Sequence, residues 1–211
     1  MINNLDLDIY DYNSLDDFDK ESHKDFFFGT GVNWTPLHIE NIFTDNQCEL
    51  IKELGYSLIV EDALTVGNGF NETIRKSKTS WLPKVHKTMW IYKQLAKLVQ
   101  EANKNFQYDI TGFHEKIQFT AYTDQNSHYD YHVDLHNFYP ARKLSIVVLL
   151  DDPKTFEGGD LIFRLGNKDD KAIMQKGSGV IFPSFVLHKV KPLISGKRHS
   201  LVAWICGPNF R

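Results

Sequence analysis

Residues 143–150 read KLSIVVLL, a short run of β-branched and aliphatic residues that is typical of a strand. Turn-forming residues follow at 157–159, 177–179 and 195–197. Many short strands separated by such turns indicate a β-sandwich or a jelly roll. The comparable segments in the second half of the chain are KIQFTAY (116–122), DLIFRL (160–165), SGVIFPS (178–184), LHKVKPL (187–193) and HSLVAWIC (199–206).

The residues before 113 predict a different layer. PLHIENIF (36–43) alternates as a strand would, and Thr44 then opens a helix with a capping pattern. HKTMWIYKQLAKLVQEANKN (86–105) gives the strongest helix signal, because apolar residues such as Tyr92 and Leu95 stripe one side. We therefore expect an α+β protein that is mainly β, with flanking helices that form an N-terminal helical layer.

The distribution of charge predicts the domain organisation. The chain has 211 residues and a net charge of −3, which suits one domain with a modest appendage. Eight acidic residues and two lysines within 1–30 predict an acidic N-terminal arm, followed by one domain over 31–211. Apolar residues interleaved in the arm favour packing on the domain over a role as a lid. Neither part is basic enough to indicate a nucleic-acid partner.

Cysteine usage and hydropathy predict a cytoplasmic protein. Cys48 and Cys206 give no disulfide framework, so we expect both to be packed as free thiols in a reducing compartment. No apolar run approaches the ~20 residues of a membrane span. The first ten residues, MINNLDLDIY, lack the charged and apolar regions of a signal peptide.

The stretch SHYDYHVDLHNF (127–138) contains three histidines and two aspartates, and its backbone geometry decides which of them share a face. A helix would align His128, His132 and His136 as a zinc site. The aromatic and β-branched neighbours favour an extended chain, in which His132 and Asp134 project from one face. His128 and His136 would share that face too, but too far from each other to bind one ion.

A His-x-Asp pair needs a third ligand, and His188 in SFVLHKV is the candidate. Two histidines and one carboxylate are the ligand set of non-haem Fe(II) oxygenases, because the set leaves open coordination positions. A single histidine in an apolar strand is more often a packed core residue. The interpretation of His188 as a metal ligand is therefore supported only by the motif that follows it.

That motif is Arg198, which opens the otherwise apolar strand SLVAW. On a strand, Arg198, Ser200, Val202 and Trp204 share one face. A buried guanidinium requires an anionic partner. A dicarboxylate cosubstrate would supply it, and the alternative is an acidic loop at the mouth of the barrel.

In this order, the motifs resemble the iron- and 2-oxoglutarate-dependent oxygenases, in particular the PKHD-type hydroxylases, which are relatives of the prolyl 4-hydroxylases. The resemblance runs from about Trp34 to the C-terminus. It implies a double-stranded β-helix, a cupin-like jelly roll, in which His132, Asp134 and His188 bind Fe(II). The segments that carry it are RKSKTSWLP (75–83), FTAYTDQNSHYDYHVD (119–134), RKLSIVVLLDDPKTFEGGDLIF (142–163) and FPSFVLHKVKPLISGKRHSLVAWICGP (182–208).

The same resemblance implies a cosubstrate site. Arg198 would hold the C5 carboxylate of 2-oxoglutarate, and Ser200 completes an Arg-x-Ser pattern that also touches it in some branches. The hydroxyl of Tyr122 would hydrogen-bond the cosubstrate and Trp204 would form an aromatic wall, with core packing as the alternative for both. The implied cofactors are Fe(II), 2-oxoglutarate and O2, with ascorbate as a candidate reductant.

The implied reaction couples decarboxylation of 2-oxoglutarate to hydroxylation, and the family favours a prolyl residue in a peptide or protein substrate. Arg75, Trp81, Tyr129 and Tyr131 are the candidate substrate residues, because a proline ring stacks well on aromatic rings. Three alternatives stay open: hydroxylation of a small molecule, free amino acid or nucleic acid; a non-catalytic cupin-like metal-binding module; and a zinc hydrolase. The acidic arm is not part of the family pattern, so the oligomeric state stays open.

Overall fold

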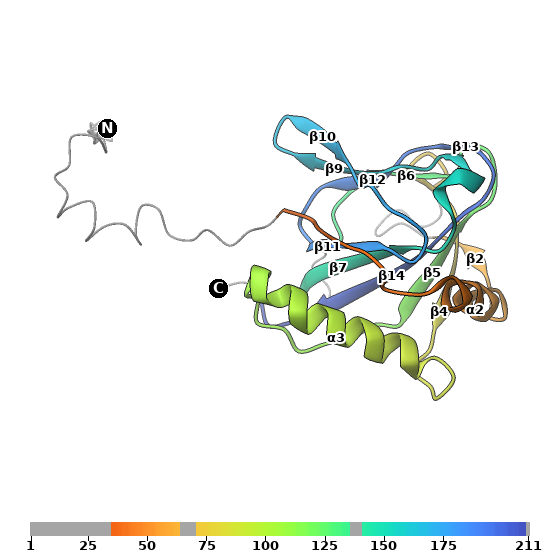
Figure 1. Ribbon diagram of the computed structural model, residues 1–211. Helices are drawn as coiled ribbons and strands as arrows, with labels where there is room; N and C mark the ends of the chain where they lie inside the picture. The colour runs from red at the N-terminus through yellow and green to blue at the C-terminus, as the bar shows by residue number, and fades with distance from the viewer. Residues whose placement is uncertain (1–34, 64–70, 136–140, 210–211) are drawn as a thin grey trace, which may run out of the picture. The chain divides into compact units, whose positions relative to one another are not determined.

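The computed structural model describes residues 35–63, 71–135 and 141–209. Within these ranges the chain forms two main antiparallel sheets and a two-stranded pair, with two α-helices on the outer side of the largest sheet (Figure 1). The acidic arm expected at residues 1–30 lies outside the described residues, as does His136. None of the described helices is both long enough and apolar enough to cross a membrane.

The larger sheet has seven strands in the order β1-β11-β7-β14-β5-β4-β2, and the smaller sheet has five in the order β10-β9-β12-β6-β3. The strands of the larger sheet are β1 (Leu37–Ile39), β2 (Glu61–Asp62), β4 (Lys78–Leu82), β5 (Ile117–Tyr122), β7 (Arg142–Leu149), β11 (Gly179–Pro183) and β14 (Arg198–Cys206). Those of the smaller sheet are β3 (Arg75–Lys76), β6 (His128–His132), β9 (Leu161–Leu165), β10 (Lys168–Lys171) and β12 (His188–Val190). A separate pair, β8 (Glu157–Gly158) and β13 (Leu193–Ser195), joins the connections at one end.

Strand β7 shows why KLSIVVLL is apolar at nearly every position. Alternate side chains of a strand point to opposite faces. Ile146 and Val148 belong to the core between the large sheet and the helices, whereas Val147 and Leu149 belong to the core between the two sheets. A central strand that is buried on both faces therefore loses the usual alternation of polar and apolar residues.

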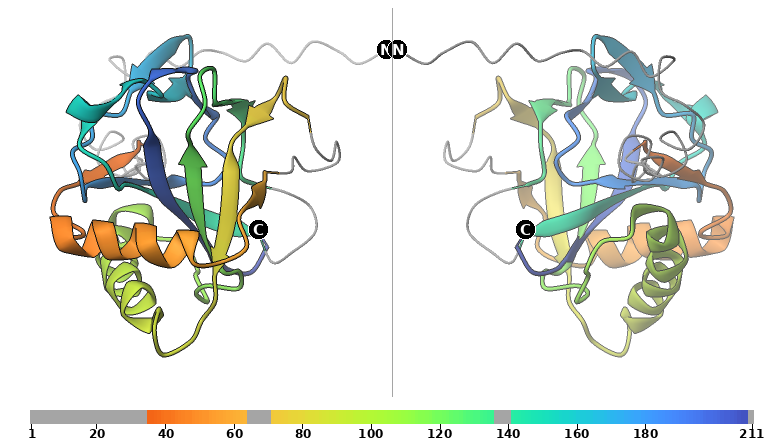
Figure 2. Two further views of the ribbon diagram at one scale, coloured as in Figure 1. Left: turned by 90° about the vertical axis from the view of Figure 1, so that its right-hand side faces the viewer. Right: turned by 90° about the vertical axis from the view of Figure 1, so that its left-hand side faces the viewer.

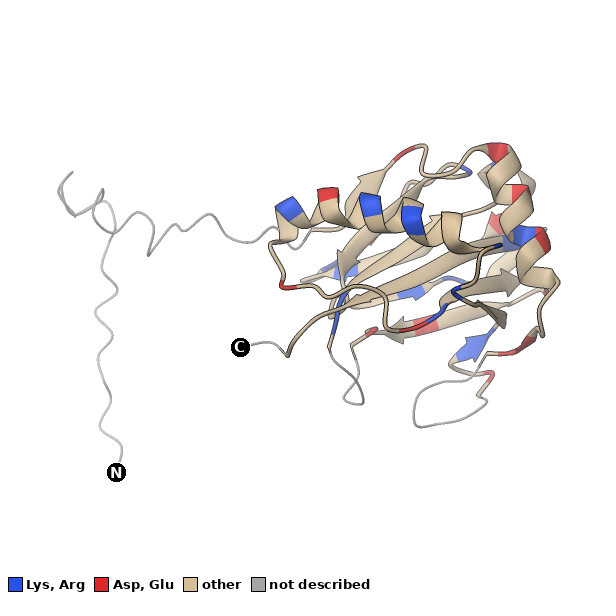
Figure 3. Cartoon of the chain, turned by 90° about the horizontal axis from the view of Figure 1, so that it is seen from below, with Lys and Arg blue, Asp and Glu red and all other residues tan. Residues whose placement is uncertain are grey.

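The two helices form the predicted helical layer. Helix α2 (Asp45–Tyr56) begins at a capping box in which Thr44 and Gln47 bond reciprocally to each other's backbone. Helix α3 (Met89–Phe106) buries a stripe that includes Leu95 and Val99. Both helices lie on the same side of the large sheet (Figure 2), and the charged residues of α3 lie along its outer side (Figure 3).

Three details differ from the sequence-based expectations. Helix α3 begins at Met89 rather than at residue 86, because residues 85–88 form a turn in which Thr88 Oγ1 donates to the Pro83 carbonyl. The segment 187–193 is broken into β12 and β13 at Pro192, which has no N–H to donate to a ladder. Strands β4 and β10 were not expected, because their polar residues KTSWL and KDDK hide the strand pattern.

Candidate metal and cosubstrate site

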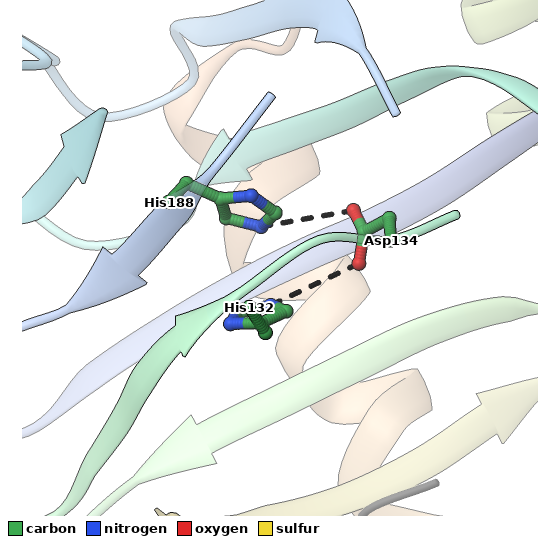
Figure 4. Close-up of side chains that lie close together, drawn as sticks. All are labelled: His132, Asp134 and His188. Carbon is green, nitrogen blue, oxygen red and sulfur yellow. Dashed lines mark ion pairs between the residues drawn. The ribbon is translucent and has the colours of Figure 1, made fainter. Parts of the chain in front are cut away.

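The two sheets enclose a cluster of His132, Asp134 and His188. His132 ends β6 and His188 begins β12, and the two residues face each other in the ladder between these strands. Asp134 follows β6, where its backbone N–H donates to the Ser184 carbonyl at 2.9 Å. The carboxylate oxygens lie 3.8 Å from His132 Nε2 and 3.7 Å from His188 Nε2 (Figure 4). One ligand atom from each residue lies within 4.8 Å of the others, which is the arrangement that one bound cation requires.

Hydrogen bonds orient both imidazole rings for ligation. His132 Nδ1 lies 2.8 Å from the Asp130 carbonyl, and His188 Nδ1 lies 2.9 Å from the Val186 carbonyl. A carbonyl oxygen only accepts, so in the neutral rings each Nδ1 carries the hydrogen and each Nε2 keeps a lone pair toward Asp134. Asp134 Oδ2 is buried with no hydrogen-bond partner in the part of the chain that the structure describes. A metal ion would satisfy this oxygen, so the three residues fit an Fe(II) ion.

The electrostatics of the cluster suit metal binding at neutral pH. Burial, reinforced by His188, lowers the pKa of His132 to about 3. Burial alone would raise the pKa of Asp134, but the neighbouring His188 and His132 hold it below its ordinary value. At neutral pH a neutral imidazole and an ionised carboxylate therefore face each other, and these are the forms that ligate metals.

A β-bulge decides which residues of β6 face the cluster. Tyr129 pairs with Val190 and His132 pairs with His188, so three steps along β6 match two steps along β12. Tyr129 and His132 consequently lie on one face, with their rings stacked at 3.5 Å. Tyr131 points to the other face, where its hydroxyl donates to Asp169 at 2.6 Å. Adjacent residues of a strand point to opposite faces, so Tyr131 lies opposite His132 and does not line the cavity, which corrects its prediction as a substrate residue.

His128 does not belong to the cluster. Its ring nitrogens lie 2.8 Å from the Asn126 carbonyl and 3.2 Å from the Thr73 carbonyl. The stretch from His128 to His132 is a strand rather than a helix, so the helical zinc arrangement is not formed.

A cavity of about 170 Å³ extends from the metal cluster between the sheets. Arg198, Ser200, Val202 and Trp204 of β14 all line it, as the period of two along that strand predicts. Tyr122 of β5 also lines it, and burial raises the pKa of this tyrosine, so its hydroxyl stays protonated at neutral pH. The structure thus brings the predicted cosubstrate residues together beside the predicted metal ligands.

Arg198 is the most deeply buried cation of the cavity, with 2% of its surface exposed. Its Nη1 donates to Ser200 Oγ at 3.3 Å, and its guanidinium lies 5.3 Å from the centre of the Tyr122 ring. No carboxylate forms an ion pair with it among residues 35–63, 71–135 and 141–209, which leaves the acidic-loop alternative without support. Gly159, at φ 65°, gives the arginine room, because a Cβ there would lie 2.9 Å from Arg198 Cδ.

Three of the four predicted substrate residues line the cavity, and Tyr131 does not. Arg75, Trp81 and Tyr129 line the cavity, and Trp81 is 42% exposed near its opening. Sequence reasoning missed Gln118 and Thr120, which also line the cavity and bond to each other at 2.7 Å. They alternate with Tyr122 on β5, so the period of two would have found them.

Arg142 is a further residue of the site that the motifs did not single out for a role. Its Nε donates to a carboxylate oxygen of Glu115 at 2.7 Å and its Nη2 donates to the other oxygen. Its Nη1 donates to the backbone carbonyl of Asp134 at 3.2 Å, and its guanidinium lies 3.9 Å from the Trp204 ring. Arg142 therefore links the loop that carries Asp134 to the aromatic wall.

Two histidines, one carboxylate and a buried arginine around one cavity of a jelly roll are the residue set typical of the non-haem iron oxygenases. Residues 117–206 match the family model of the 2OG-Fe(II) oxygenase superfamily, so this part of the chain is a 2OG-Fe(II) oxygenase domain. The family whose motifs the sequence resembles is thereby confirmed, and its description names Fe(II) and 2-oxoglutarate, the cofactors expected from the sequence.

Curated relatives are PKHD-type hydroxylases. One from Prochlorococcus marinus (strain AS9601) is 29% identical over 165 residues, which cover 70% of this chain and 74% of the relative. Another, from Prochlorococcus marinus (strain NATL2A), is 36% identical over 80 residues, or 37% of this chain and 36% of the relative. A PKHD-type hydroxylase from Alteromonas mediterranea is matched over 41% of its length. This chain therefore spans less than half of the length of these last two relatives.

Solved structures confirm the predicted fold. A prolyl-4-hydroxylase from Pseudomonas putida superposes with a TM-score of 0.68 and 19% identity, covering 84% of this chain and 95% of its own. A second structure is a prolyl hydroxylase from Trichoplax adhaerens in complex with a peptide fragment of the hypoxia inducible factor oxygen degradation domain. It superposes with a TM-score of 0.71 and 17% identity, covering 92% of this chain and 94% of its own. At these identities the likeness establishes the jelly roll and leaves the substrate open.

Proposed function

We propose that this protein is an Fe(II)- and 2-oxoglutarate-dependent dioxygenase that hydroxylates a prolyl residue in a peptide or protein. The observation that carries the proposal is the buried Arg198, which has no ion pair with a described residue and shares one cavity with the cluster of His132, Asp134 and His188. A metal-binding module without a cosubstrate would have no use for a desolvated guanidinium at this place. A dicarboxylate bound between the cation and the metal ligands makes use of both.

The residues divide the work by position. His132, Asp134 and His188 would hold Fe(II), which when bound supplies the coupled decarboxylation of 2-oxoglutarate and activation of O2. Arg198 binds the C5 carboxylate through its planar fork, and the hydroxyls of Tyr122 and Ser200 lie in the same cavity to support it. Arg198, Tyr122 and Ser200 are all buried, which strengthens these interactions.

Support for a prolyl substrate comes from the relatives and from the mouth of the cavity. A structural neighbour is a prolyl hydroxylase in complex with a peptide. In this chain Trp81 is half exposed beside Trp204, with ring centroids 6.1 Å apart, and Tyr129 lines the same cavity. Aromatic rings of this kind pack well against a proline ring.

A cytoplasmic location belongs to the same proposal. Cys48 and Cys206 are both free and buried, which is consistent with a reducing compartment.

Succinate formation tests the proposed reaction. The full chain is incubated with Fe(II), 2-oxoglutarate, O2 and ascorbate, with and without a library of proline-containing peptides. We expect succinate only when iron and 2-oxoglutarate are both present, an increase with a subset of peptides, and a mass gain of one oxygen on proline.

The other outcomes separate the alternatives. Metal binding without any succinate would contradict the oxygenase assignment and leave a non-catalytic module. Succinate that no peptide increases would move the substrate to a small molecule, a free amino acid or a nucleic acid. Turnover that needs zinc instead of iron would point to a hydrolase.

A further inference from the structure

The charged side chains that line the cavity are mostly cations. Its cations are Arg75, Arg142 and Arg198, and Asp134 is the only carboxylate among the described residues that line it. The indole Nε1 of Trp204 is buried with no hydrogen-bond partner in the described part of the chain. A cavity with three cations and one carboxylate among its described lining residues selects ligands rich in acceptors, and above all anions.

Two of the three arginines have an assignment. Arg142 forms a two-pronged ion pair with Glu115, which neutralises its charge locally. Arg198 takes the C5 carboxylate of 2-oxoglutarate in the proposed function, and the other carboxylate of that cosubstrate belongs with the metal. Asp134 belongs to the cluster of candidate metal ligands as well. Neither Asp134 nor a carboxylate of 2-oxoglutarate is therefore left to pair with Arg75.

Arg75 is buried and forms no ion pair with any residue that the structure describes. It is 7% exposed, its Nε donates to Ser77 Oγ at 3.1 Å, and its guanidinium lies 4.5 Å from the centre of the Tyr129 ring. No carboxylate within residues 35–63, 71–135 and 141–209 forms an ion pair with it. Arginine stays charged at any physiological pH, and a buried charge without a counter-ion is costly.

The position of Arg75 places it beside the reacting centre. Arg75 pairs with Tyr129 in the ladder between β3 and β6, and the Tyr129 ring stacks on His132. Arg75 is therefore separated from a proposed metal ligand by a single aromatic ring, and it comes from the smaller sheet. Arg198 comes from β14 of the larger sheet, so the two cations reach the one cavity from different sheets.

We propose that Arg75 binds a carboxylate of the substrate itself, so that the substrate class is a molecule with a carboxylate close to the carbon that is hydroxylated. The proposal rests on the proposed function, because it assigns the cosubstrate to Arg198. The carboxylate has two sources: an acidic residue next to the target residue of a peptide, or the α-carboxylate of a free amino acid. Both present the same planar anion to the guanidinium fork.

Matched pairs of ligands test this inference by binding, without turnover. The full chain is loaded with Fe(II) and 2-oxoglutarate in the absence of O2 and titrated calorimetrically. One series contains capped tripeptides with a central proline flanked by Asp or Glu, each compared with its Asn or Gln counterpart. The other compares free amino acids with their amides. We expect at least one carboxylate to bind roughly 30-fold or more tighter than its neutral match, because a buried charge pair is lost in the match.

Variants tie the preference to one residue. Arg75→Gln should remove the preference for the carboxylate, and Arg75→Lys should restore part of it because the charge returns without the fork. Arg164→Gln is the matched control, since Arg164 lies outside the cavity and bonds to Asp169 and Tyr131. Retention of 2-oxoglutarate binding in Arg75→Gln shows that the variant is folded.

Each result decides the inference. Preference in the peptide series identifies a peptide source, and preference in the amino-acid series identifies a free amino acid. Equal binding within every pair, including no binding at all, overturns the inference, as does a preference that survives in Arg75→Gln. Failure of 2-oxoglutarate itself to bind the iron-loaded wild type would instead contradict the proposed function.

Discussion

The candidate ligands come together through a local irregularity that a simple strand pattern does not contain. The expected geometry placed His132 and Asp134 two residues apart on one face of a strand. In the structure β6 ends at His132, and Asp134 reaches the cluster from the following loop, where Ser184 holds its backbone. His132 and Asp134 could be identified from the sequence because residues two positions apart can approach one another both on a continuous strand and where a strand passes into a loop. The bulge that brings Tyr129 onto the face of His132 was not predictable, since nothing in the strand's own sequence indicates it.

Substitution of single residues tests the ligand set. His132→Ala, Asp134→Ala and His188→Ala should each lose bound Fe(II), because each removes one of three ligand atoms that lie within 4.8 Å of one another. His128→Ala should keep the metal, since the ring of His128 is bonded to two backbone carbonyls elsewhere. Elemental analysis after anaerobic loading and desalting measures the effect, with circular dichroism as the check on folding. Equal loss of iron in His128→Ala and His132→Ala would contradict this ligand set.

At the scale of elements, a polar cluster anchors helix α2 to the strands behind the cavity. Asp151, which follows β7, accepts from Lys52 Nζ at 3.0 Å and from His199 Nδ1 at 2.8 Å. His199 Nε2 in turn meets the Tyr56 hydroxyl at 2.7 Å. His199 is the neighbour of Arg198 on β14 and points to the opposite face. The cluster therefore fixes the start of the strand that carries Arg198.

The pKa of Asp151 predicts a pH-dependent contribution of this cluster. Burial would raise the pKa, but His199 and Lys52 hold it below the ordinary value of 3.8. A depressed carboxyl pKa stabilises the folded state above the unfolded pKa, and the contribution is lost as the pH falls below about 4. Asp151→Asn should thus lower the free energy of unfolding at pH 7 by roughly 1–3 kcal/mol. The gap from wild type should shrink toward pH 3, as measured by urea unfolding.

The control for this prediction is Asp170→Asn, because Asp170 is exposed on β10 and takes part in none of the described ion pairs. Its effect should stay within about 0.5 kcal/mol at both pH values. A gap between wild type and Asp151→Asn that is constant from pH 7 to pH 3 would show that the carboxylate charge does not stabilise the cluster.

For most elements the sequence was sufficient, and the exceptions have a physical reason. Strands such as β7 and β14 are recognisable because burial on two faces demands apolar residues. Strand β4 lies between β5 and β2 in the same sheet, although its sequence KTSWL is largely polar. Ser80 can be buried there because its hydroxyl donates to the Gly55 carbonyl at 2.7 Å. Such partners are distant in sequence, so a pattern search along the chain does not find them.

At the scale of the whole molecule, the site joins the two sheets. His132 and His188 belong to the smaller sheet, whereas Tyr122 and Arg198 belong to the larger one. The side chains proposed to hold the metal and the cosubstrate therefore come from both sheets. A ligand that binds only the folded state stabilises it by mass action, so occupancy of this site is measurable as global stability.

Arg198→Ala should separate the two ligands in a thermal unfolding experiment. For the wild type loaded with Fe(II) without O2, 2-oxoglutarate at about 100 times its Kd should raise Tm by roughly 5–10 °C. Arg198→Ala should lose this rise and keep the rise caused by the metal, because Arg198 is not one of the three metal-binding side chains. Arg198→Lys should keep part of the rise caused by 2-oxoglutarate, since an ammonium retains the charge without the two-pronged geometry.

Arg164→Gln, whose side chain lies outside the cavity, should behave as wild type. A full rise in Arg198→Ala would mean that another cation of the cavity, Arg75 or Arg142, holds the cosubstrate, and the division of the cavity into two anion sites would have to be reversed.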